Sequence, residues 1–171
     1  AVEAQAAGIY WDAMRIVLGE YGFRERIKRP EKRRGASEDI VNKALNTGYN
    51  LLAGTLWKYV LRFSLDPYMG YLHVERPGRL SLVYDLVEPY RPIYDRFTAS
   101  LLRRGVISGD MSAKTFYKTL REKYYEEFLA HRLRYQGRRC RLETTMFLYV
   151  ESIVSYLNGR RASIKPPRIS W

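Results

Sequence analysis

The chain has 171 residues, 46% of them hydrophobic and 28% charged, and its formal net charge is +12. This composition is typical of a globular protein and excludes an intrinsically disordered chain. No run of about 18 uncharged apolar residues occurs, which excludes a membrane-spanning helix. The surplus of Lys and Arg favours nucleic acid as a partner, although an anionic membrane surface or an acidic protein would suit the same charge.

The N-terminal half predicts two helices joined by a basic loop. Apolar side chains recur at helical spacing in the first segment: Ala6, Ala7, Tyr10, Met14 and Val17. Residues 23–35 are polar and basic and contain Pro30 and Gly35, so we expect a loop there. A long helix is expected over residues 40–63, with Ser37 and Asp39 as candidate N-caps.

The segment from residue 64 to 80 contains two prolines and two glycines, which predict an ordered loop. A helix follows over about 81–104, bent or interrupted at Pro89 and Pro92. Two further helices are expected at 112–135 and 141–158, before a basic tail. The sequence therefore predicts an all-α fold: a single bundle-like domain of five or six helices that covers residues 1–171.

The single cysteine, Cys140, cannot form a disulfide within the chain and leaves no second sulfur ligand for zinc. We interpret it as a buried thiol in a reducing cytoplasm. The first 20 residues include Glu3 and Asp12 and no basic stretch, which is not the pattern of a signal peptide. We therefore expect a cytoplasmic protein.

Four side chains are candidates for chemistry. Glu3 begins the first helix, His73 lies in the glycine-containing loop, and Asp85 and Glu88 are spaced i, i+3 among apolar neighbours. Carboxylates and an imidazole form a suitable site for Mg²⁺ or Mn²⁺. The spacing alone also fits solvated carboxylates and a structural histidine, so this pattern leaves both interpretations open.

The combination of these residues with their neighbours resembles a known family. The string GYLHVERPGRLSLVYDLVEPYRPIYDR, the upstream strings SEDIVNKALNTGYNLLAG and LDPYMG, and the opening EAQAAGIYW occur in the same order as the motifs of that family. It is the CRISPR-associated endonuclease and integrase of spacer acquisition, the first Cas protein. The motif resemblance extends from about residue 2 to 105, and from there to about 160 it holds only in helical character.

The resemblance implies metal ligation by Glu3, His73 and Glu88, with Asp85 as a further catalytic carboxylate. It implies a DNA endonuclease and integrase that uses Mg²⁺ or Mn²⁺, with a 3′-hydroxyl attacking a phosphodiester of the CRISPR leader–repeat. The family also implies a homodimer and a small ferredoxin-like second Cas protein as partners. Its usual N-terminal β-rich domain has no counterpart in this sequence, so we expect the chain to be part of a longer one.

A non-catalytic, basic DNA-binding or assembly module with the same fold is the alternative function. In either case the expected partner is DNA, branched or double-stranded. We do not expect the chain to bind a membrane. The candidate DNA contacts are the basic residues of the loop after the first helix and of the segment around His73: Arg24, Arg26, Lys28, Arg29, Lys32, Arg33, Arg34, Arg76, Arg79 and Arg91.

Overall fold

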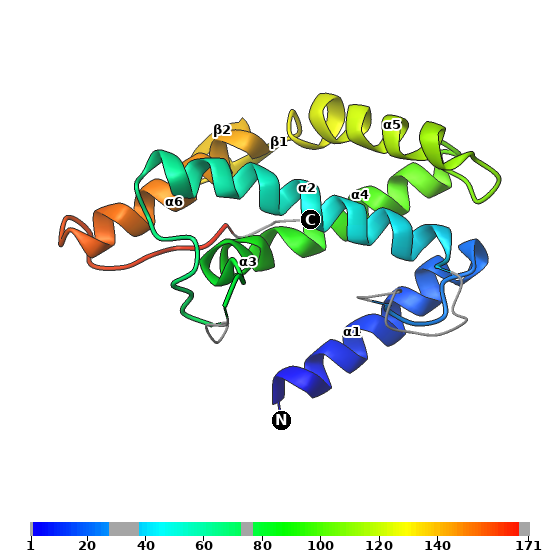
Figure 1. Cartoon of the computed structure of the whole chain (residues 1–171), viewed down its shortest axis with the longest axis horizontal. Coiled ribbons are helices and arrows are strands. Elements are labelled where there is room, and N and C mark those ends of the chain that lie inside the picture. Colours follow the sequence, from blue (N-terminus) through cyan, green and yellow to red (C-terminus); the bar gives the residue numbers. More distant parts are fainter. Residues whose placement is uncertain (1, 28–37, 73–76, 168–171) are drawn as a thin grey trace. The chain divides into compact units, whose positions relative to one another are not determined.

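The computed structural model describes residues 2–27, 38–72 and 77–167, with only the helical backbone described for residues 2 and 3. The elements in chain order are α1 (Val2–Leu18), the 3₁₀ turn η1 (Gly19–Tyr21), α2 (Ile40–Arg62), α3 (Ser81–Val87), the 3₁₀ turn η3 (Glu88–Tyr90), α4 (Arg91–Arg103), α5 (Ala113–Lys123), the π-helical turn η4 (Tyr124–Phe128), β1 (Arg132–Tyr135), β2 (Arg138–Arg141) and α6 (Leu142–Leu157) (Figure 1). The predicted, mostly helical fold class is confirmed. No helix in the described ranges is long and apolar enough to cross a bilayer.

The chain divides into two compact units, and the divisions fall within α2, α4 and α5. Unit 1 comprises Ala1–Gly48 and Asp95–Leu120, and unit 2 comprises Tyr49–Tyr94 and Arg121–Trp171. The single domain expected over residues 1–171 stays a prediction.

In unit 1, the start of α2 is fixed by a polar cluster. Asp39 caps the helix as predicted, because its carboxylate accepts a hydrogen bond of 2.8 Å from the backbone N–H of Asn42. The fully buried Asn42 amide also donates to the Glu25 carbonyl at 2.9 Å and accepts from the Ile27 N–H at 2.8 Å. These bonds tie residues 25–27 to the first turns of α2.

In unit 2, three aromatic rings form a buried cluster. Tyr124 and Phe128 of η4 stack with centroids 5.3 Å apart, and Tyr94 meets Phe128 edge-on at 5.1 Å. The Tyr124 hydroxyl lies 2.8 Å from that of Thr55 on α2. A buried phenol needs such a polar partner, because an unbonded hydroxyl in an apolar interior costs folding free energy.

One helix prediction is confirmed and another needs correction. The break at the prolines is confirmed, since η3 separates α3 from α4 there. The helix predicted over 112–135 is wrong at its end, because residues 132–135 form β1 and pair with β2. The two turn residues, Gln136 and Gly137, both have positive φ (49° and 80°), as a type I′ hairpin turn requires. Cys140, expected to be buried, is a half-buried residue of β2.

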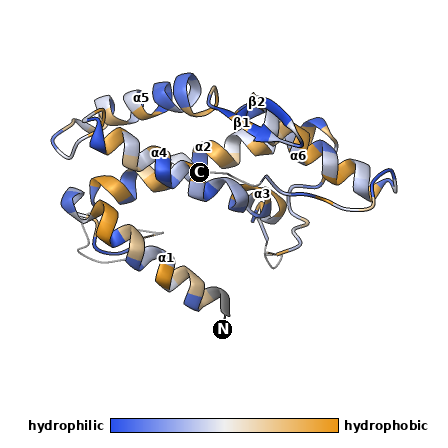
Figure 2. Ribbon diagram, turned by 180° about the vertical axis from the view of Figure 1, so that it is seen from behind, coloured by the Kyte–Doolittle hydropathy of each residue, from blue (hydrophilic) through white to orange (hydrophobic). Residues whose placement is uncertain are grey.

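The apolar stripe predicted for the first helix is only partly buried. Tyr10 and Met14 are half-buried, whereas Ala6, Ala7 and Val17 are exposed. Figure 2 shows apolar colouring on the described turns of α1. The helix was predicted correctly, but spacing alone does not reveal whether a partner covers the stripe.

Candidate functional site

The candidate site is built on α3, which places a carboxylate among buried apolar side chains. Leu82, Val83, Leu86 and Val87 are all buried, and Asp85 between them has no exposed surface. Burying a carboxylate is costly unless hydrogen bonds replace its water. The donors come from the loop before the helix: Asp85 Oδ2 accepts from the backbone N–H groups of Tyr71 at 2.6 Å and Leu72 at 2.9 Å.

The same loop is held at two further points. The Tyr71 hydroxyl lies 3.3 Å from the hydroxyl of Tyr149 on α6. The carbonyl of Pro67 accepts a hydrogen bond of 3.1 Å from the N–H of Leu82, at the start of α3. Burial raises the pKa of Tyr149, and the hydrogen bond with Tyr71 raises it further, so this hydroxyl stays protonated near neutral pH. The backbone that leads into residue 73 is thus fixed by contacts from α3 and α6.

Glu88 begins η3, one helical turn after Asp85, and is held differently. Its side chain is 34% exposed and forms an ion pair with Arg91, in which Nη1 lies 2.8 Å from Oε1 and 3.0 Å from Oε2. The Arg91 guanidinium also packs over the ring of Tyr49, 4.9 Å from its centroid. The Glu88 carboxylate is thus partly exposed and oriented by a charge-assisted pair.

The remaining predicted ligands cannot be placed. His73 lies outside the described residues, and Glu3 lies in α1 with its side chain outside them. Among the side chains that the structure does describe, no group of three His, Cys, Asp or Glu lies close enough together to hold a metal ion. The structure therefore supplies geometry for Asp85 and Glu88 of the four predicted site residues.

The predicted DNA-contacting cations have three outcomes. Arg24 is exposed and Arg79 is half-buried. Arg26 is engaged within unit 1: its guanidinium donates to Asn42 at 2.9 Å and to Asn46 at 2.6 Å. The others, apart from Arg91, lie outside the described residues: Lys28, Arg29, Lys32, Arg33, Arg34 and Arg76.

Two features of this part of the chain were not predicted from the sequence. Tyr149 lies 78 residues after Tyr71, and no local pattern links them. Arg132 and Arg134 fell within the helix predicted over 112–135, although Arg, Leu, Arg, Tyr at 132–135 alternates with the period of a strand.

A family model described as CRISPR associated protein Cas1 matches residues 1–132. The chain belongs to the Cas1 family. The predicted family resemblance is therefore confirmed, and it places the Asp85–Glu88 turn inside the matched region.

Curated relatives agree with this assignment. The chain is 46% identical over 179 residues to the CRISPR-associated endonuclease Cas1 of Korarchaeum cryptofilum, covering 100% of this chain and 50% of the relative. It is 32% identical over 170 residues to a CRISPR-associated endonuclease Cas1 of Archaeoglobus fulgidus, covering 94% of this chain and 49% of the relative. The chain thus spans about half the length of the curated Cas1 proteins it matches.

Two solved structures are similar in fold. A casposase bound to an integration product aligns with a TM-score of 0.83 and 27% identity, over 99% of this chain and 52% of the casposase. A Cas1 protein from Thermotoga maritima aligns with a TM-score of 0.73 and 20% identity, over 95% of this chain and 52% of that protein. The second likeness concerns the fold alone.

Proposed function

We propose that this chain carries the catalytic site of a divalent-metal-dependent DNA endonuclease and integrase. The reaction is the insertion of spacer DNA into a CRISPR array, in which a 3′-hydroxyl attacks a phosphodiester; water in place of the hydroxyl gives hydrolysis. The observation that carries the proposal is the turn from Asp85 to Glu88, where one carboxylate fixes the backbone leading into His73 and the next is partly exposed. The curated relatives named as Cas1 endonucleases, and the casposase bound to its integration product, support this reaction class.

The residues present fit Mg²⁺ or Mn²⁺. Glu88 offers a carboxylate that already has a cationic partner in Arg91, and His73 and Glu3 are the other proposed ligands. Oxygen donors with an imidazole suit such hard or borderline ions. A divalent ion held by these three residues would polarise the scissile phosphate and stabilise the charge that develops on its oxygens.

The other residues of the turn position this set. Asp85 accepts hydrogen bonds from the N–H groups of Tyr71 and Leu72, so it fixes the position of the backbone directly before His73. Arg91 orients the Glu88 carboxylate, and its guanidinium is a donor suited to a phosphate oxygen of the bound strand. In this proposal Asp85 is a positioning residue, and its contribution to the reaction is through His73.

DNA is the proposed macromolecular partner, in the cytoplasm. Arg24, Arg79 and Arg91 are proposed contacts, together with the predicted cations that lie outside the described residues; Arg26 is left out because Asn42 and Asn46 hold its guanidinium. A homodimer and a small ferredoxin-like second Cas protein stay predictions from the family.

The test is Mn²⁺-dependent cleavage and strand transfer on a branched DNA, comparing the unmodified chain with His73→Ala and Glu88→Ala. Glu126→Gln is the matched control, because Glu126 is an exposed carboxylate of η4 in the same unit as Glu88. We expect activity in the unmodified chain and the control, a loss of at least about 100-fold in both site variants, and unchanged DNA binding.

Each other outcome has a distinct meaning. Activity that survives both site substitutions would place the chemistry elsewhere and overturn the proposal. Salt-sensitive DNA binding without activity in any variant would favour the alternative, a non-catalytic DNA-binding or assembly module. Calorimetric titration with Mn²⁺ distinguishes the enzyme from the non-catalytic module, since only the enzyme requires metal binding that Glu88→Ala weakens.

A further inference from the structure

The hairpin of β1 and β2 carries an unusual concentration of one charge. Residues 131–141 include five arginines and neither Asp nor Glu. All five arginines are exposed: Arg132, Arg134, Arg138, Arg139 and Arg141. Figure 2 shows the ribbon of both strands as strongly hydrophilic. We call this set the arginine hairpin.

The strand register places four of these side chains on one face. Arg132 lies opposite Arg141, and Arg134 lies opposite Arg139. Directly opposed side chains in an antiparallel pair have Cβ atoms about 5 Å apart, and next-but-one residues of a strand are about 6.7 Å apart. Two arginine pairs therefore form a compact rectangle of positive charge.

The opposite face anchors the hairpin. On this face Tyr135 is buried and Leu133 and Cys140 are half-buried, whereas Arg138, beside the turn, is exposed. The Tyr135 hydroxyl donates to the carbonyl of Lys165 at 3.2 Å, and Arg161 donates to Gln136 in the turn at 3.3 Å. The C-terminal segment therefore holds the hairpin and adds Arg161 beside its turn.

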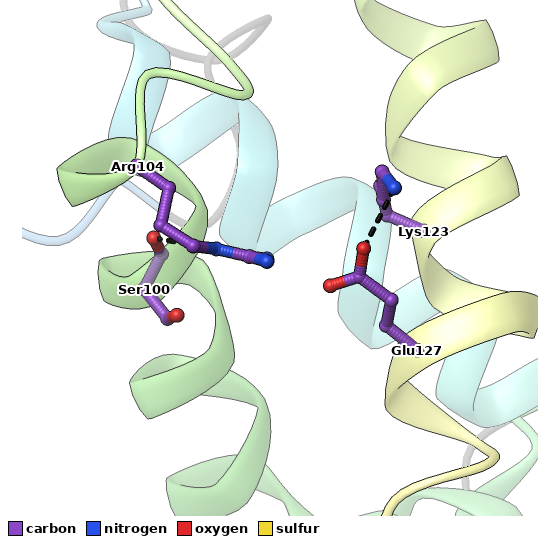
Figure 3. A network of polar contacts seen from close by, with 4 residues as sticks. All are labelled: Ser100, Arg104, Lys123 and Glu127. Carbon is purple, nitrogen blue, oxygen red and sulfur yellow. Dashed lines mark hydrogen bonds and ion pairs between the residues drawn. The ribbon is translucent and has the colours of Figure 1, made fainter.

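This arrangement carries a folding cost. Like charges directly opposite each other on a sheet are destabilising, and no carboxylate of the described residues forms an ion pair with any arginine of the hairpin. The neighbouring turn η4 differs, because Lys123 pairs there with Glu127 at 2.6 Å (Figure 3). Figure 3 also shows Arg104, which directly follows α4, donating to the Ser100 carbonyl. Within the described part of the chain, the charge of the hairpin is thus not neutralised by an ion pair.

We propose that the arginine hairpin is a docking surface for the phosphate backbone of duplex DNA. Guanidinium groups bind phosphates through two parallel N–H···O bonds. Duplex DNA carries one negative charge per about 1.7 Å of its axis, a density that a compact set of cations matches. A two-stranded ribbon is also narrow enough to enter the major groove. The choice of DNA over an acidic protein rests on the proposed function.

The experiment measures equilibrium binding of a fluorescent duplex to the whole chain over a series of salt concentrations, without divalent metal. The variant is the pair Arg134→Gln/Arg139→Gln. The matched control is Lys114→Gln/Arg121→Gln, which removes the same charge from exposed positions of α5. Loss of two phosphate contacts lowers the slope of log K against log salt by about 1.8 and weakens binding roughly tenfold to thirtyfold at 0.15 M salt. The control is expected to retain the slope.

A second measurement excludes a folding defect. Because the variant removes a like-charge pair, we expect its Tm without DNA to be equal to or above that of the unmodified chain, most clearly at low salt. Arg134→Lys/Arg139→Lys keeps the charge and is expected to retain most of the salt slope.

Three results would overturn the proposal: an unchanged slope and affinity in the glutamine variant, an equal loss in the α5 control, or binding of polyglutamate in preference to the duplex. The outcome is separable from that of the proposed function. Binding that depends on the hairpin and chemistry that depends on Glu88 are measured independently, so either can fail while the other stands.

Discussion

The buried carboxylate of Asp85 accepts a hydrogen bond of 2.6 Å from the backbone N–H of Tyr71. A second bond, from Leu72, makes one carboxylate oxygen the acceptor for two successive N–H groups. The spacing of Asp85 and Glu88 among apolar neighbours left open whether they bind a cation or are solvated. The structure shows another solution for Asp85, in which the loop itself compensates its burial.

Replacing Asp85 distinguishes a positioning carboxylate from a metal ligand. Asp85→Ala leaves both loop donors without this acceptor, and we expect it to lower the free energy of unfolding by about 1–3 kcal/mol and to expose residues 71–80 to proteolysis. Asp85→Asn keeps an acceptor oxygen, so it should restore most of the stability and much of the activity. An asparagine variant that is stable, protected from proteolysis and as inactive as the alanine variant would instead indicate direct participation in the chemistry.

The buried amide of Asn42 predicts a second stability effect. It forms hydrogen bonds with the Asp39 cap, the Glu25 carbonyl and the Arg26 guanidinium. Asn42→Ala therefore removes a hydrogen-bond partner from several polar groups at once. We expect a loss of about 2–4 kcal/mol, measured by urea unfolding. Asn50→Ala on the exposed side of the same helix is the control and should change stability by less than about 0.5 kcal/mol. Equal effects would show that Asn42 contributes only helix propensity.

The bond between Thr55 and Tyr124 can be tested with two neighbouring tyrosines. Tyr124 is fully buried, whereas Tyr125 is 45% exposed. Tyr124→Phe removes the hydroxyl that lies 2.8 Å from Thr55 and should cost about 1 kcal/mol in thermal or urea unfolding. Tyr125→Phe should be close to neutral. A neutral Tyr124→Phe would mean that the Thr55 hydroxyl is satisfied by the Leu51 carbonyl alone, to which it also donates.

Local signals in the sequence were sufficient for much of the fold. The Asp39 cap and the interruption between α3 and α4 were predicted because capping and proline geometry act within a few residues. The hairpin was not, because its arginines fit an exposed helix face as well as a strand, and Gln-Gly is a weaker turn signal than Asn-Gly. The register that opposes Arg134 to Arg139 becomes visible only once the turn is known.

The metal site of Glu3, His73 and Glu88 stays a prediction, and the sequence did not reveal the different surroundings of Asp85 and Glu88. The i, i+3 spacing brought Asp85 and Glu88 to one turn, and the motif resemblance linked them to His73. Which carboxylate faces a ligand depends on contacts from residues 13 and 14 positions earlier, Leu72 and Tyr71. Such contacts are set by tertiary packing, which the spacing of residues along one helix does not encode.

The tyrosines predict how stability depends on alkaline pH. Burial, and then the carboxylate of Glu143, raises the pKa of Tyr59 to about 12, and burial also raises the pKa values of Tyr90 and Tyr124. An unfolded tyrosine ionises near pH 10, so between about pH 10 and 12 the unfolded state loses protons that the folded state keeps. The free energy of unfolding is therefore fully retained below about pH 10 and decreases as the pH rises through this window.

Absorbance at 295 nm, which reports tyrosinate, and far-UV circular dichroism, which reports helix, check this on the same samples. The chain has 15 tyrosines. At pH 11 we expect the folded chain to show only part of the tyrosinate absorbance that the denatured chain shows, and the remainder to appear together with the loss of helix. Tyr59→Phe should make stability fall less steeply between pH 10 and 12. Ionisation of every tyrosine in one step near pH 10, with the helical signal intact, would contradict the burial of Tyr90 and Tyr124, because a phenol enclosed by the fold cannot ionise without opening it.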